Sequence, residues 1–87
     1  MPKSETPFGA AVVLERVSIP QKAGDKRFSS VFELLETDRG DRLVRVAYTT
    51  NGTVRRGPVT LRVRDVARLR EALDKTPELA ELLFGAA

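Results

Sequence analysis

The stretch NGTVRRGPVTLRVRDVARLREAL, residues 51–73, decides the fold because it joins a hairpin turn, a strand and a helix. Asn51-Gly52 is a strong signal for a two-residue hairpin turn, since both residues tolerate a positive φ. In the second half of residues 53–63, apolar residues alternate with polar ones, which predicts a strand. After Asp65, which can cap a helix, the apolar residues recur at helical spacing. The stretch therefore predicts the last strand of a sheet followed by a helix.

Three further strands are predicted before this unit. Residues 9–19 are rich in β-branched side chains, and we expect Pro20 to end the strand that they form. Residues 27–37 and 42–50 are typical of a second hairpin, whose tight turn contains Gly40.

Four strands followed by a helix predict an α+β domain, in which a four-stranded antiparallel sheet carries the C-terminal helix on one face. We expect residues 9–87 to form this single domain. Residues 1–8 have two prolines and no periodicity, so we expect a flexible tail there. The second face of the sheet is expected to stay open, and it is the place where we expect a binding site.

The composition of the 87 residues argues against several functions. Without Cys or His, the chain lacks thiol nucleophiles, the usual general base and the commonest zinc ligands. The spacing to a second acid or to a nucleophile is not recognisable for Asp38, Asp41 or Asp65. We therefore expect that the protein is not an enzyme and that it has no catalytic residue, metal site or cofactor. No apolar run could span a bilayer and no signal peptide is recognisable, so we expect a soluble, intracellular protein without a membrane or small-molecule partner.

Arginine is concentrated in one part of the chain. Residues 39–70 contain nine arginines and two aspartates, a net charge of +7 in a chain whose total is +3. The planar guanidinium fork matches phosphate and can stack on bases. The pattern is compatible with a polyanionic partner, and equally with an ordinary wet surface in a genome that prefers arginine codons.

Strand alternation places Arg45 and Arg62 on the open face, opposite the valines expected to meet the helix. Arg39 and Arg42 lie at a turn, and a bend at Gly57-Pro58 would turn Arg55 and Arg56 toward solvent. Strand 27–37 leaves two options, with either Val31 and Leu35 or Phe28 and Phe32 facing out. An exposed Phe32 or Tyr48 could stack on bases, whereas a buried one is ordinary core. The candidate nucleic-acid-binding residues are therefore Arg39, Arg42, Arg45, Arg55, Arg56, Arg62, Phe32 and Tyr48.

The C-terminal residues carry an apolar helical stripe. Thr76-Pro77 predicts a second cap with Pro at the first helical position, and Gly85 is expected to end the helix. We expect the stripe to pack on its own sheet and on a partner's helix. Its residues, which are also the candidate dimer interface, are Leu69, Leu73, Leu79, Leu82 and Leu83.

The pair Arg55-Arg56 before Gly57, and Leu61 leading into Val66 and Leu69, resemble the positive cofactor four family of transcriptional coactivators. The run RFSSVFELLETDRGDRLVRV, residues 27–46, is also similar to the repeats of Pur-alpha proteins. These families share a fold with the plant Whirly proteins. One residue more than in the coactivators separates Gly57 from Leu61.

The resemblance implies a homodimer joined through its C-terminal helices, whose curved sheets bind single-stranded DNA, or RNA, with low sequence specificity. Such a protein acts in transcription regulation, replication or repair. It would be cytoplasmic and nucleoid-associated in a prokaryote, and nuclear in a eukaryote. The alternative is a protein–protein interaction module whose basic sheet face has no nucleic-acid role.

Overall fold

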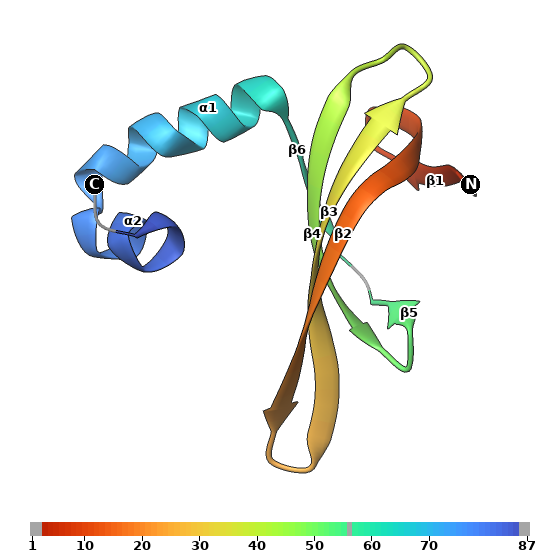
Figure 1. The fold of residues 1–87 in the computed structure, drawn as a ribbon, viewed down its shortest axis with the longest axis vertical. Helices are drawn as coiled ribbons and strands as arrows, with labels where there is room; N and C mark the ends of the chain where they lie inside the picture. Colours follow the sequence, from red (N-terminus) through yellow and green to blue (C-terminus); the bar gives the residue numbers. More distant parts are fainter. Residues whose placement is uncertain (1–2, 56, 86–87) are drawn as a thin grey trace.

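The computed structural model describes residues 3–55 and 57–85, which form an α+β fold with a curled antiparallel sheet and two C-terminal helices (Figure 1). The elements in chain order are β1 (Lys3–Thr6), β2 (Gly9–Ala23), β3 (Lys26–Thr37), β4 (Arg42–Thr50), β5 (Thr53–Val54), β6 (Val59–Arg62), α1 (Val63–Ala72), the 3-10 turn η1 (Leu73–Lys75) and α2 (Pro77–Phe84).

The sheet has the order β1-β2-β3-β4-β5, and β6 pairs with β4 next to β5. The register aligns side chains in rows across the strands. One row contains Val17, Phe32, Val46 and Val59, from β2, β3, β4 and β6. The neighbouring row is offset by one residue and therefore points to the opposite face. It contains Arg16, Glu33, Arg45 and Thr60.

The face that carries Glu33 and Arg45 lies inside the curl, and we call it the inner face. The small hydrophobic core lies there, with Leu35 and Leu43 at most 1% exposed. The β1 hairpin covers part of this face, because the Ser4 hydroxyl accepts a hydrogen bond from Arg45 Nη1 at 2.8 Å. The sheet therefore buries its inner face mostly against itself.

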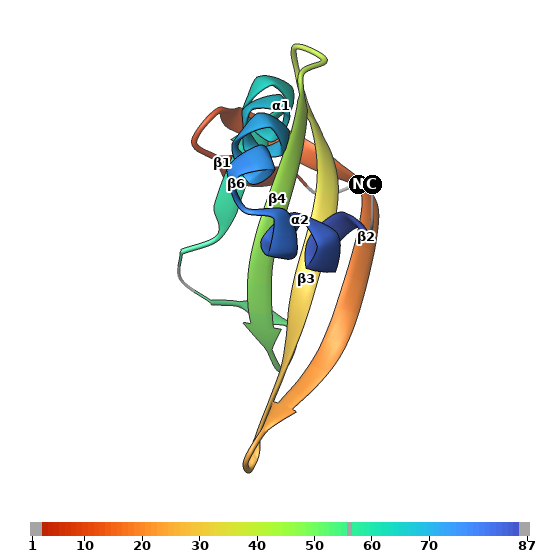
Figure 2. The ribbon, with the colours of Figure 1, turned by 90° about the vertical axis from the view of Figure 1, so that its left-hand side faces the viewer.

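We call the opposite face, which carries Phe32 and Val46, the outer face. α1 begins over it at the β6 end, and the helices then project away from the sheet (Figures 1 and 2). α2 packs on η1, and the side chains of Val59, Leu79 and Leu82 remain 54%, 49% and 79% exposed. The chain thus leaves an apolar sheet face and an apolar helix stripe without a covering layer among the described residues.

The structure confirms the predicted turns and both predicted ends of the second helix. Asn51 has a φ of 53° and Gly52 of 78°, and they join β4 to β5. The predicted strand 53–63 is split into β5 and β6 at the expected bend near Gly57. α2 has Pro77 in its first turn, and Gly85 follows its last residue.

Three expectations about the elements are wrong. The segment expected to be a flexible tail contains β1, because a turn at Thr6–Gly9 pairs it with β2. In this turn Thr6 Oγ1 donates a hydrogen bond to the Gly9 carbonyl at 2.7 Å and accepts one from the Phe8 amide at 3.0 Å. Pro20 does not end β2, because it lies where β2 pairs with β3 only, and a missing N–H costs nothing on an outer edge. The expected single helix is two helices, since η1 and Thr76 interrupt it.

Candidate nucleic-acid interface

Arg45, expected on an open face, is buried. It is 7% exposed, and its Nε donates to Glu33 Oε1 at 2.8 Å. Arg16 from β2 approaches the other carboxylate oxygen of Glu33 at 3.7 Å. The alternation that places Arg45 opposite the valines is right, but the curl and the β1 hairpin close its face. Arg45 therefore has a structural partner and little access to a ligand.

Arg62 is also on the inner face, and its guanidinium is engaged twice. Its Nε donates to Asp65 Oδ2 at 2.9 Å, and its Cζ lies 5.1 Å from the centre of the Phe8 ring. Asp65 also accepts the backbone N–H of Arg62 at 3.1 Å. Asp65 is therefore at the third position of α1, where it reaches back to the residue that precedes the helix, and it is not itself the first cap.

The hydrogen bond from the Arg62 side chain, with that from its backbone amide, lowers the pKa of Asp65 to about 2. The same pairing raises the pKa of Arg62. Because the carboxyl pKa is depressed in the fold, the stabilising pair is complete above the usual pKa of 3.8 and is lost as the pH falls toward 2.

We expect an NMR titration to give Asp65 a carboxyl pKa of about 2. The variant Arg62→Gln should return this pKa toward the ordinary value of 3.8, because the charged side-chain donor is lost. An unchanged Asp65 titration in the variant would contradict the assigned cause.

The other arginines predicted as ligands are dispersed. Arg42 is exposed at the β3–β4 turn and its Nε lies 3.0 Å from Glu36 Oε2, while Arg39 is exposed in the turn itself. Arg55 is exposed after β5, at the opposite end of the sheet. Arg56 lies outside the described residues. The predicted set is therefore not brought together on one surface.

Two of the predicted residues, Tyr48 and Arg55, do meet. The Arg55 amide donates to the Tyr48 carbonyl at 3.0 Å, and both side chains line one open hollow of about 500 Å³. The same hollow is lined by Lys26, Arg27 and Phe28 from the end of the β2–β3 hairpin. We call these five residues the basic–aromatic cluster.

The rings in the basic–aromatic cluster are packed edge to face. The centroids of Phe28 and Tyr48 are 6.2 Å apart at an interplanar angle of 81°, and Tyr48 is 46% exposed. No carboxylate lines the hollow. Three cations beside an accessible ring provide donors for phosphates and a surface for a base.

Phe32 does not belong to this cluster. It lies in the row of Val17, Val46 and Val59 on the outer face, next to apolar rather than basic side chains. This resolves the ambiguity of β3, where Phe28 and Phe32 share the outer face and Val31 and Leu35 are buried. Of the predicted helix stripe, Leu73 is buried within its own chain, whereas Leu69, Leu79, Leu82 and Leu83 are exposed.

Lys26 and Arg27 were missed as candidates because they precede the arginine-rich segment 39–70 in sequence. The signal that could identify them is the hairpin register, which places Arg27 and Phe28 on β3, beside the end of β4 that carries Tyr48. Comparison of the chain with known protein families, curated proteins and solved structures found no match. None of the helices in the described ranges has the length and apolarity to cross a membrane.

Proposed function

We propose that the protein binds single-stranded nucleic acid, preferably DNA, with low sequence specificity, and that the basic–aromatic cluster is its contact surface. The observation that carries this proposal is the exposed Tyr48 ring amid Lys26, Arg27 and Arg55 in a hollow without carboxylates. In this position the guanidinium and ammonium groups hold phosphates, while an unpaired base stacks on the ring. Neither contact depends on base identity.

This surface differs from the one that the arginine pattern predicts, because Arg45 and Arg62 have protein partners. The charge on the sheet end is nevertheless favourable. The strand-end cations Lys26, Arg27 and Arg55 have no ion-pair partner among the described residues, so binding does not require breaking a salt bridge. The sequence resemblance to the positive cofactor four and Pur-alpha families also supports the proposal, and on this ground we propose a role in transcription, replication or repair.

We propose further that the protein acts as a homodimer. A compact monomer of this mass exposes about 5,100 Å², whereas this chain exposes 6899 Å². The excess of about 1,800 Å² exceeds the roughly 800 Å² that each partner buries in a stable interface. A second copy supplies a matching surface, because each chain has both an uncovered apolar sheet face and an uncovered apolar helix stripe.

In such a dimer, the row of Val17, Phe32, Val46 and Val59 is the sheet part of the interface, and Leu79, Leu82 and Leu83 are its helix part. Phe32 then serves association rather than base stacking. The basic–aromatic cluster lies at the hairpin end of the sheet, beyond this row, and remains accessible.

Binding of fluorescent oligo-dT, measured by anisotropy at low salt, tests the proposed surface. We expect Tyr48→Ala to weaken binding by roughly 10- to 100-fold, since stacking on one base contributes about 1–3 kcal/mol. Arg55→Ala should reduce the slope of log K against log salt by about 0.7, the value for one phosphate on a single strand.

Arg39→Ala is the matched control, because it removes an exposed arginine at the opposite end of the sheet. It should bind oligo-dT nearly as the unmodified protein does. Absence of oligo-dT binding at low salt, or equal binding to duplex DNA, would refute the proposal.

A further inference from the structure

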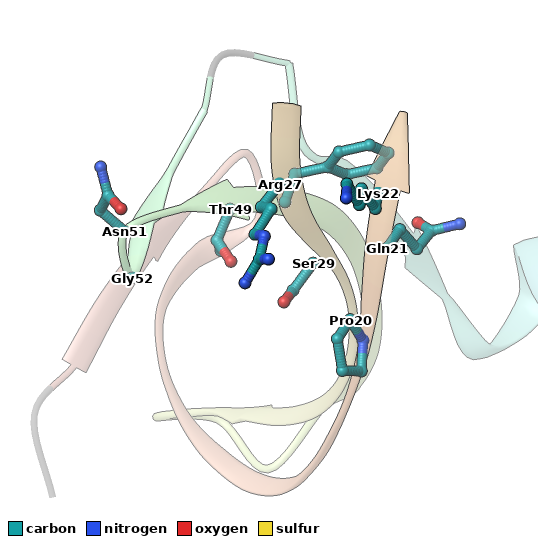
Figure 3. A pocket seen from close by; sticks show the side chains of 9 residues that line it. Pro20, Gln21, Lys22, Arg27, Ser29, Thr49, Asn51 and Gly52 are labelled. Carbon is teal, nitrogen blue, oxygen red and sulfur yellow. The ribbon is translucent and has the colours of Figure 1, made fainter. Parts of the chain in front are cut away.

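A second hollow opens at the same end of the sheet, on the inner face. It has a volume of about 390 Å³ and lies inside the curl (Figure 3). The rings of the basic–aromatic cluster, Phe28 and Tyr48, belong to the outer face instead. Arg27, Ser29 and Thr49 point into its interior in Figure 3. Lys22 lines it as well, and no carboxylate does.

Two cations and two hydroxyls of this hollow have no side-chain partner among the described residues, whereas Gln21, which also lines it, accepts a hydrogen bond from Ser30 Oγ. Within the described ranges, no ion pair engages Lys22 or Arg27. No side-chain hydrogen bond among the same residues holds the hydroxyls of Ser29 or Thr49. Thr49 is 6% exposed, so its side chain is confined on the inner face of β4. Two cations and two hydroxyl donors thus face one small space.

The hollow is closed toward the middle of the sheet. Ser29 pairs with Thr49, and the next pair on the same face is Val31 with Ala47. Val31 is 1% exposed, and behind it lies the buried pair of Glu33 and Arg45. The hollow thus ends at Val31 on the side of the sheet's middle and is open at the strand ends, where the terminus of a strand can enter it.

From this geometry we infer that the inner hollow binds the terminal phosphate of a single strand. A phosphomonoester carries a charge near −2 at neutral pH and has three free oxygens, which matches two cations and two hydroxyls better than an internal phosphodiester does. This inference rests on the proposed function. Arg27 and Phe28 line both hollows, so a strand whose end lies in the inner hollow can continue onto Tyr48.

The test compares oligo-dT with a 5′-phosphate, a 3′-phosphate or neither, each labelled at the other end or internally. We expect one phosphorylated form to bind about tenfold or more tightly than the unphosphorylated strand, because a charge-assisted cluster engages its end. Thr49→Val, which keeps the side-chain shape, should reduce this preference several-fold and leave the affinity for unphosphorylated oligo-dT unchanged. Lys22→Ala should also reduce the preference, whereas Lys75→Ala on η1 should not.

Equal affinity for all three oligonucleotides would overturn the terminal-phosphate inference and leave the proposed function intact. Binding of none of them would overturn both. Inorganic phosphate and dTMP serve as separate competitors. If either binds as tightly as the phosphorylated strand, the hollow recognises a free anion, and its assignment to a strand end is wrong.

Discussion

Replacing Glu33 by Ala is expected to destabilise the protein by about 3–5 kcal/mol, because it leaves Arg45 buried without its carboxylate. The Glu33 side chain is 5% exposed and the Arg45 side chain 9%. A positive charge in this position cannot recover its hydration while the curl stays closed. Since small domains are stable by only about 5–15 kcal/mol, this loss is a large part of the total.

Urea unfolding followed by circular dichroism at a fixed protein concentration measures the effect. The double variant Glu33→Leu/Arg45→Met should recover much of the loss, because apolar residues of similar volume can replace a buried ion pair at little cost. The exposed pair of Lys3 and Asp38, 2.9 Å apart, provides the control. Lys3→Ala should cost less than about 1 kcal/mol, and a Glu33→Ala variant as stable as Lys3→Ala would contradict the assigned role.

The second large effect is expected at the helix stripe. Leu82 is 79% exposed in the single chain, so its replacement by Asp disturbs no packing within that chain. In the proposed homodimer the same side chain is buried, and the substitution places a charge in an apolar interface. We expect Leu82→Asp to raise the dimer dissociation constant by about two orders of magnitude, from lost burial and the cost of desolvating the carboxylate.

Sedimentation velocity over a concentration series distinguishes the outcomes. Lys75→Asp introduces the same side chain, with an even larger change in net charge, at a nearby exposed position outside the stripe, and it should remain dimeric. Phe32→Asp should dissociate the dimer as Leu82→Asp does, because the sheet row is the other half of the interface. If the unmodified protein sediments as a monomer at micromolar concentrations, the homodimer proposal fails, and the apolar outer face is then better assigned to a different protein.

Local signals in the sequence predict much of this fold. Asn51-Gly52 and Gly40 specify their turns by conformational preference alone. The change from alternation to helical spacing predicts the helix three residues too late, because it places the cap at Asp65 and the observed cap is Arg62. β1 escapes prediction, because a four-residue strand held by one hairpin has too short a pattern.

The side of the sheet that closes is harder to predict than the alternation itself. Alternation correctly groups Arg45 with Arg62, but Arg45 is buried by the curl and by the contact of Ser4 with Arg45, which joins residues distant in sequence. One signal in the sequence indicates the burial of Arg45. Glu33 and Arg45 lie directly opposite each other in the β3–β4 hairpin, so they can form an ion pair on the same face. The basic–aromatic cluster escaped prediction because its members come from segments that only the register brings together.

Pro20 affects how readily the protein can aggregate through the edge of its sheet. Beyond Val12, the outer edge of β2 pairs with no strand among the described residues, and such an edge can recruit the strand of another molecule. Pro20 withholds an amide in the middle of that edge and so interrupts any incoming ladder. Open-ended growth of a fibril along this edge is thereby disfavoured.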